Sequence, residues 1–167
     1  IPTEKPLNKH LMMVLCIRLR GLILSSTRCM YFGPLPDDLR RRHEAVCRVD
    51  SVFITETRPG TAVADIFSKA CQAYAEAGFP DEWKLHHQGG ACGYAPRDYL
   101  GKPDAAQTVL SEQAFAWNPS ITGTKSEDTI LVKKEKNEIL SAGSTWPMID
   151  VPTNRETVRR PDILVIT

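Results

Sequence analysis

The sequence predicts an α+β domain on three observations. Two apolar, strand-like stretches lie on either side of Gly21, and two helix-like stretches with apolar faces follow them. After Gly78 the chain changes to short apolar runs separated by turn residues. Two helices flanked by strands that pair among themselves are typical of this fold class, and a length of 167 residues suits one domain.

Residues 10–32 are expected to form two strands around Gly21, with the sequences HLMMVLCIRLR and LILSSTRCMYF. The first is a nearly continuous apolar run, which predicts a strand buried on both faces. After the breaking sequence GPLP, Asp37 or Asp38 is the candidate N-cap of a helix that ends before RPG.

Thr61 is the N-cap candidate of the second helix, and Gly78 is placed to end it as a C′ glycine. The polar sequence PSITGTKSE is predicted to be a loop between strands. The predicted strands of this second part are residues 113–119, 128–134, 137–142 and 163–167.

Charge and composition exclude several classes of protein. The formal net charge is +1, so there is no basic excess for nucleic acid. The apolar run at 11–17 is far shorter than the about 20 residues of a membrane helix, and no signal-peptide cleavage pattern follows it. Five cysteines, an odd number with no close pair, fit neither a disulfide framework nor a zinc knuckle. They indicate a reducing compartment, and we expect a cytoplasmic protein.

The sequence KLHHQGGACGY contains the first candidate site residues, His86 and His87. Imidazole is the usual base near neutral pH and the commonest metal ligand. Neighbouring residues on a strand point to opposite faces, so at most one of the two histidines is expected to face a given site. A structural or surface histidine is the simpler interpretation. Gly89 and Gly90 favour a function, because they let backbone or a ligand approach closely.

The polar loop 118–128, NPSITGTKSED, is the second candidate. It is either a plain hairpin connection or a group of hydrogen-bonding side chains at the ends of strands, beside a carboxylate. The sequence leaves both interpretations open.

The order of these parts resembles the M24 metallopeptidase family, which includes methionine aminopeptidase, Xaa-Pro aminopeptidase, prolidase and creatinase. The resemblance covers about residues 10–145. It rests on the strand hairpin with TR, a long helix, RPG, a helix ending in glycine, and then HHQGGACGY, AFAWNPSITGT and SEDTIL. It implies the pita-bread fold, an antiparallel curved sheet with helices on one side.

The resemblance places five metal-ligand positions of the family on this chain. His87 takes the histidine position, Glu127 takes the last, bridging carboxylate, and the other three fall on Val14, Ser25 and Asn118. Valine and serine lack the carboxylate that such cations need, and asparagine is a weak, neutral substitute. One histidine and one glutamate cannot neutralise the about four positive charges of a metal pair in a partly dry site. We therefore predict that the dinuclear metal site is lost and that no cofactor is needed. If the site were kept, Mn, Co, Zn or Fe would be expected.

Three functions remain open after this comparison. The first is a metal-independent hydrolase of a small amide or peptide-like substrate, as creatinase is metal-free within the family. In it, His87 would be the acid–base group, Glu127 its partner or the base for water, and Asn118 and Thr124 hydrogen-bond donors to the substrate. The second is a non-catalytic peptide- or protein-binding module, as in the large subunit of the FACT histone chaperone. The third is an active metal-dependent Xaa-Pro peptidase.

Further expectations concern the pocket and the boundaries of the domain. Ser25, Thr27 and Tyr94 are predicted to line the substrate pocket with the residues above. Residues 1–9 are expected to be a linker or the end of a preceding segment. Residues 10–167 would then be the C-terminal domain of a longer chain. The expected partner is a small-molecule or peptide substrate, with no nucleic acid and no membrane. A homodimer is possible, because dimers are common in the family.

Overall fold

The computed structural model describes residues 3–4, 6–143 and 145–167, and it confirms the predicted α+β class. Of the predicted linker, residues 1, 2 and 5 lie outside the described residues, and its other residues belong to no helix or strand. The chain opens with an antiparallel hairpin of β1 (His10–Leu19) and β2 (Leu22–Phe32). Arg20 and Gly21 turn the hairpin with φ of 51° and 88°. Positive φ at both central residues is the geometry that two-residue hairpins favour.

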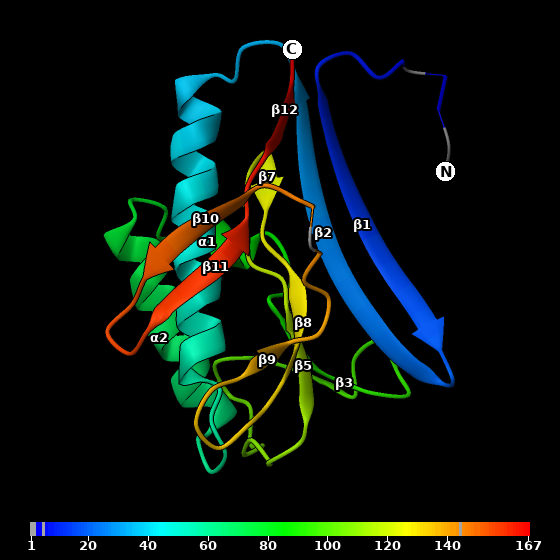
Figure 1. The fold of residues 1–167 in the computed structure, drawn as a ribbon. Coiled ribbons are helices and arrows are strands. Elements are labelled where there is room, and N and C mark those ends of the chain that lie inside the picture. Colours follow the sequence, from blue (N-terminus) through cyan, green and yellow to red (C-terminus); the bar gives the residue numbers. More distant parts are fainter. Residues whose placement is uncertain (1–2, 5, 144) are drawn as a thin grey trace.

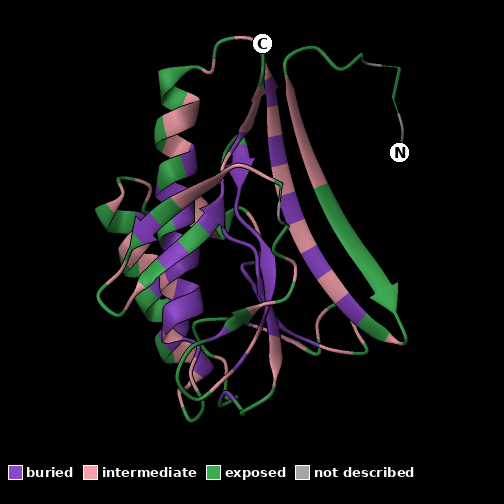
Figure 2. Cartoon of the chain, in the orientation of Figure 1, coloured by how far each residue is buried: buried purple, intermediate pink, exposed green. Residues whose placement is uncertain are grey.

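The expected burial of the first strand on both faces is wrong. The residues of β1 are half-buried up to Met13 and exposed from Val14 to Leu19, whereas β2 after Leu22 alternates between buried and half-buried residues. Figure 2 shows the contrast between the two strands. The cause is the position of β1, which lies at the edge of its sheet, in the order β1-β2-β12. The continuous apolar run therefore marks a strand that little of the described chain covers.

Two helices follow, α1 (Asp37–Glu56) and α2 (Val63–Glu76), close to the predicted ranges. Their N-caps are Pro36 and Ala62 rather than the predicted aspartates and Thr61. The two aspartates lie in the first turn of α1, where their charge favours the positive end of the helix dipole. Gly78, with φ of 86°, follows the C-cap of α2 as predicted.

The second half builds a five-stranded antiparallel sheet in the order β4-β3-β5-β8-β9. Figure 1 shows both helices on one side of β2, β5 and β8, with a β10–β11 hairpin across α1. A short 3₁₀ helix, η1 (Glu82–Lys84), precedes this sheet. The last strand pairs with β2 in parallel, the one parallel pair among the described strands. The strands after η1 are β3 (Gly89–Cys92), β4 (Tyr99–Leu100), β5 (Ala114–Trp117), β6 (Ser120–Ile121), β7 (Thr124–Lys125), β8 (Asp128–Leu131), β9 (Glu138–Ile139), β10 (Met148–Pro152), β11 (Thr157–Pro161) and β12 (Leu164–Ile166).

The main core lies between the two helices and the five-stranded sheet. Its centre is an aromatic stack in which Trp117 lies 4.4 Å from Phe53 and 5.3 Å from Phe115, between ring centroids. The indole N–H of Trp117 donates to Thr57 Oγ1 at 2.8 Å, so its polar atom is satisfied inside the core. Since Trp117 ends β5, this packing fixes the position of Asn118 and of the polar loop after it.

At the double glycine of HHQGG the backbone of neighbouring strands comes close, as the sequence suggested. Gly89 has φ of 91°, and a Cβ there would lie 2.1 Å from the carbonyl oxygen of Ala116 on β5. A Cβ on Gly90 would lie 2.1 Å from the carbonyl oxygen of Tyr99 on β4. Both glycines are therefore explained by the packing of β3 between its neighbouring strands, without a ligand.

The two sheets meet where β2 passes beside the start of β8. The backbone N–H of Thr27 donates to the carbonyl oxygen of Glu127 at 3.0 Å, and the two residues form an antiparallel bridge. Thr129 Oγ1 accepts from the N–H of Ser25 and donates to its carbonyl oxygen. These contacts hold the candidate residues of the two sheets side by side. Over the described residues, no helix is long and apolar enough to cross a bilayer.

Candidate functional site

Glu127 is the centre of the candidate site, and side chains of the protein surround its carboxylate. Glu127 is 2% exposed. Thr27 Oγ1 donates to Oε2 at 2.6 Å, Arg97 Nη2 donates to Oε1 at 3.2 Å, and Lys125 Nζ lies 3.4 Å from Oε2. Both carboxylate oxygens therefore have a cationic neighbour, and one also has a hydroxyl donor.

The two cations reach Glu127 from different elements. Lys125 lies on β7, two residues before Glu127, and its side chain is 8% exposed. Arg97 comes from the loop between β3 and β4, and its side chain is 15% exposed. Burial of this kind is unusual for lysine and arginine unless they are paired. The partner of both is the same carboxylate, which carries one negative charge against two positive ones.

A second, largely buried network lies next to Glu127. Arg160 is 0% exposed and its Nη2 lies 2.7 Å from Asp50 Oδ2 and 2.9 Å from Asp128 Oδ2. Arg28 Nη2 donates to Asp128 Oδ1 at 2.9 Å. Ser126 Oγ donates to Asp50 Oδ2 at 2.5 Å. The two acids and two bases of this network balance in charge.

Burial raises the pKa of Asp50 to about 6, although Arg160 and the Ser126 hydroxyl oppose the shift. Asp50 is on α1, Asp128 on β8 and Arg160 on β11, so one guanidinium ties three elements together. This arrangement fixes the backbone on both sides of Glu127. We read the network as the support of the site rather than as part of its chemistry.

The two histidines lie together rather than on opposite faces. They belong to the loop between η1 and β3, and their rings stack with centroids 4.4 Å apart. The alternation expected of strand residues therefore does not apply to them. His86 is half-buried and His87 is exposed. The N–H of Gly89 donates to His87 Nδ1 at 3.3 Å, and His86 Nδ1 is buried without a hydrogen-bond partner among the described atoms.

Both histidines favour the neutral form. Burial lowers the pKa of His86, and the charge of Lys125 lowers it further. Burial also lowers the pKa of His87, as do the neighbouring His86 and Arg97. The charge of Glu127 acts in the opposite direction on both and is outweighed. Within the described part of the chain, no hydrogen bond or ion pair joins either histidine to Glu127. The predicted catalytic roles of His87 and Glu127 stay a prediction.

The predicted residues of the hairpin divide into two groups. Ser25 and Thr27 are 1% and 2% exposed and face β8. Val14 lies opposite Thr27 in the register, and Cys16 lies opposite Ser25, with Sγ 3.2 Å from Ser25 Oγ. Val14 is 51% exposed and carries no polar atom on its side chain. The face on which the family would place two carboxylates thus presents valine and serine.

The remaining predicted residues differ in how freely they can meet a ligand. Asn118 is 3% exposed, and its Oδ1 is buried without a partner among the described residues. Thr124 is also buried, and its hydroxyl lies 2.7 Å from Nδ1 of His43. Since His43 Nε2 must donate to the carbonyl oxygen of Pro161 at 3.0 Å, Nδ1 accepts the hydroxyl proton of Thr124. Tyr94 is 75% exposed, and Arg18 Nη1 donates to its carbonyl oxygen at 3.0 Å.

Sequence reasoning missed Lys125, Arg97 and the buried His43. Lys125 and Glu127 are two residues apart next to a strand, and this spacing puts side chains on one face. The signal for Lys125 was therefore present. Arg97 approaches from a separate loop, and no spacing in the sequence links it to Glu127. Over residues 3–4, 6–143 and 145–167, no three or more His, Cys, Asp or Glu side chains are grouped to hold a metal ion.

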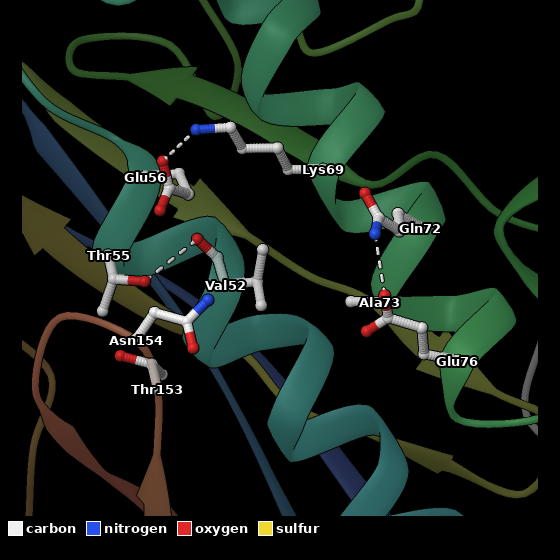
Figure 3. Close-up of a pocket in the computed structure, with 9 residues that line it drawn as sticks. All are labelled: Val52, Thr55, Glu56, Lys69, Gln72, Ala73, Glu76, Thr153 and Asn154. Carbon is white, nitrogen blue, oxygen red and sulfur yellow. Dashed lines mark hydrogen bonds and ion pairs between the residues drawn. The ribbon is translucent and has the colours of Figure 1, made fainter.

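One surface hollow includes the two histidines, and another lies on the helices, away from the predicted site residues. One of about 340 Å³ includes both histidines, with Trp83, Leu100 and Lys102 among its other lining residues. The other, of about 280 Å³, lies between α1, α2 and the β10–β11 turn. Figure 3 shows two polar pairs in it: Lys69 pairs with Glu56, and Gln72 donates to Glu76. Neither hollow is lined by Glu127 or by the side chains that contact its carboxylate.

Comparison with known proteins agrees with the fold described above. An agropine synthesis cyclase of Rhizobium rhizogenes is 27% identical over 114 residues, which are 65% of this chain and 28% of the cyclase. A prolidase of Thermococcus sibiricus superposes with a TM-score of 0.80 at 13% identity, over 99% of this chain and 43% of the prolidase. The N-terminal domain of the FACT complex subunit SPT16 of chickpea (Cicer arietinum) superposes with a TM-score of 0.67 at 15% identity, over 81% of this chain and 36% of that domain.

The chain thus spans less than half the length of each of these proteins. The structural likeness confirms the predicted pita-bread fold. The model of metallopeptidase family M24 matches residues 1–134, most of the chain. The chain therefore belongs to metallopeptidase family M24.

Proposed function

We propose that this domain is a metal-independent M24 module that binds a small amide or peptide-like ligand without needing to hydrolyse it. The observation that carries the proposal is that side chains of the protein contact both carboxylate oxygens of Glu127. A bridging carboxylate offers its oxygens to two metal ions, but here Thr27, Arg97 and Lys125 contact those oxygens. The protein itself supplies the positive charge that metal ions would supply in a metallopeptidase.

A metal pair does not fit these residues. A divalent ion bound to Glu127 at about 4 Å from Lys125 or Arg97 would be repelled by about 8 kcal/mol from each, at an effective dielectric constant of about 20. The ligand positions Val14, Ser25 and Asn118 offer no carboxylate to offset that repulsion. Charge and ligand chemistry therefore act in the same direction, against a metal ion.

Hydrolysis without a metal ion is the second candidate, and the state of the histidines favours it. Both have a lowered pKa, so a neutral imidazole is available as a base near pH 7. Both histidines line the hollow of about 340 Å³, so a ligand that occupies it would lie beside an imidazole. Against this candidate stands Glu127, whose oxygens are engaged by other side chains and do not orient an imidazole.

The test is the metal content of the protein purified without chelator, followed by assays with and without added Mn. We expect well under 0.1 metal ions per chain, because binding would have to overcome the repulsion estimated above. Addition of Mn, Co or Zn should leave the melting temperature unchanged, since a ligand that does not bind the native state does not stabilise it.

The same preparation decides between the two candidates. A panel of Xaa-Pro dipeptides and small amide compounds should give no turnover if the domain only binds its ligand. Turnover without metal that is lost in His86→Ala would favour the hydrolase. Near-stoichiometric metal, or turnover that needs Mn and is lost in Glu127→Ala, would overturn both candidates and assign a metallopeptidase.

A further inference from the structure

The buried charges around Glu127 do not balance. Four bases and three acids form the two connected networks described above. One positive charge is therefore left over in a largely buried position, where an unpaired charge is costly. The bases are Arg28, Arg97, Lys125 and Arg160, and the acids are Asp50, Glu127 and Asp128.

The excess charge is located at Lys125 and Arg97. Arg28 and Arg160 have Asp50 and Asp128 as partners, whereas Lys125 and Arg97 share Glu127.

The donors of these two side chains are also incompletely used. Lys125 Nζ has three hydrogens to donate, and its one ionic contact in the described structure is the 3.4 Å approach to Glu127. Arg97 Nε is buried without a hydrogen-bond partner among the described residues. Arg97 Nε is thus a buried donor without a described partner, and Lys125 Nζ has hydrogens left to donate. Donors that carry a net positive charge suit an oxyanion, which accepts charge-assisted hydrogen bonds at short distance.

An acceptor without a described partner lies opposite Glu127 in the strand register, because the pairs Trp117–Asp128 and Ser120–Lys125 flank Asn118. Asn118 precedes the β6–β7 hairpin that carries Lys125, and the hairpin brings Pro119 and Ser126 into hydrogen-bond contact at 3.1 Å. Its Oδ1 is buried and has no described partner, so it can accept an N–H from a ligand. The site thus offers cationic donors and a separate neutral acceptor.

We infer that Lys125 and Arg97 bind the carboxylate of a ligand that also carries an N–H group, as an amino acid or short peptide does. The carboxylate would take the place next to Glu127 that the family gives to metal ions. Asn118 would accept the N–H of the ligand. This inference rests on the proposed metal-independent function and names the class of ligand for that same site.

The experiment measures the melting temperature of the chain in EDTA with sodium acetate, with the dipeptide Gly-Pro and with its C-terminal amide. Sodium chloride at equal ionic strength is the reference, because it corrects for screening. Acetate and Gly-Pro should raise the melting temperature above the reference, and Gly-Pro should do so at lower concentration. The amide should have at most a tenth of the affinity of Gly-Pro, since it lacks the charged acceptor.

Variants test whether the binding uses the residues named. Lys125→Met and Arg97→Met should each weaken Gly-Pro binding about 10-fold or more, the effect of one charge-assisted hydrogen bond. Lys125→Arg keeps the charge and should retain binding, which separates recognition from folding. Lys133→Met is the matched control, because Lys133 pairs with the exposed Glu112, outside the proposed site. This variant should bind Gly-Pro as the wild type does.

Three results would overturn the inference. They are equal affinity for Gly-Pro and its amide, no stabilisation by either carboxylate beyond chloride, and full binding in a folded Lys125→Met chain. Stabilisation by inorganic phosphate but not by carboxylates would assign another anion. Binding that appears when EDTA is replaced by Mn, and never in EDTA, would instead contradict the proposed function.

Discussion

Replacing Glu127 by glutamine tests whether this carboxylate is a counter-ion or a vacant ligand position. The substitution keeps the size of the side chain and an oxygen that can accept from Thr27, but it removes the charge. If Glu127 serves to hold Lys125 and Arg97, the neutral amide leaves two buried cations without a partner. If it is a carboxylate kept for a metal ion, its removal relieves an unfavourable buried charge and stability rises. The two interpretations therefore predict opposite signs.

The expected loss is about 3 kcal/mol in the free energy of unfolding. Breaking a buried ion pair by removing one partner costs about 3–5 kcal/mol. The lower end applies here, because the side chains of Lys125 and Arg97 are 8% and 15% exposed and so retain some contact with water. For a chain of this length the loss corresponds to a melting temperature lower by about 6–12 °C.

Urea unfolding in EDTA, followed by tryptophan fluorescence, measures this loss, since Trp117 is buried and reports on the core. Glu112→Gln is the control. Its partner is the exposed Lys133, and the change should stay within about 0.5 kcal/mol. In the double variant Glu127→Gln/Lys125→Met, the loss in the free energy of unfolding should be smaller by about 1–3 kcal/mol than the summed losses of the two single variants. A Glu127→Gln chain as stable as the wild type, or more stable, would refute the counter-ion role.

Two further predictions concern the packing around the site. Burial lowers the pKa of His43 below the value of about 6.5 for an unfolded chain, so its contribution to stability is complete above pH 6.5 and is lost as the pH falls. The urea midpoint of the wild type should therefore fall as the pH is lowered from 7.5 to 5.5, and the midpoint of His43→Gln should fall less. If the variant showed the same pH dependence as the wild type, the role of this residue would be contradicted. Gly89→Ala should cost about 3 kcal/mol or more, because its Cβ would lie 2.1 Å from the carbonyl oxygen of Ala116 at a φ of 91°. Gly78 has a similar φ but open space around it, so Gly78→Ala should cost about 1–2 kcal/mol. Equal losses for the two substitutions would show that the chain relieves the clash at Gly89.

The elements with strong local signals could be predicted from the sequence. The first hairpin has long β-type runs on either side of Gly21, and both helices have apolar residues on one face and recognisable ends. Strand β3 was missed because its sequence, GGAC, contains none of the residues that favour strands. The β10–β11 hairpin was missed because it contains two prolines and charged residues, and prolines within a run argue against a strand.

The candidate site was predicted only as far as local spacing reaches. Thr27 and Glu127 were named through the family resemblance, and the structure joins them at 2.6 Å. The charges that satisfy Glu127 were not found, since Arg97 arrives from a loop 30 residues away in the sequence. Arg160 was missed for the same reason: its partner Asp50 lies on a helix formed much earlier in the chain. Buried pairing between distant residues leaves no period or motif in a single sequence.

The exposure of β1 has a consequence for the behaviour of this chain at high concentration. The strand is ten residues long and lies at the edge of its sheet, and its exposed apolar residues include Val14, Leu15, Ile17 and Leu19. A free strand edge with such side chains is a template on which other chains can add by backbone pairing. The isoelectric point of about 7.8 leaves little charge repulsion near neutral pH to oppose that association. A surface that covers β1 would therefore raise the solubility of this polypeptide. A charged residue on the exposed face of that strand is the simplest substitution with the same effect.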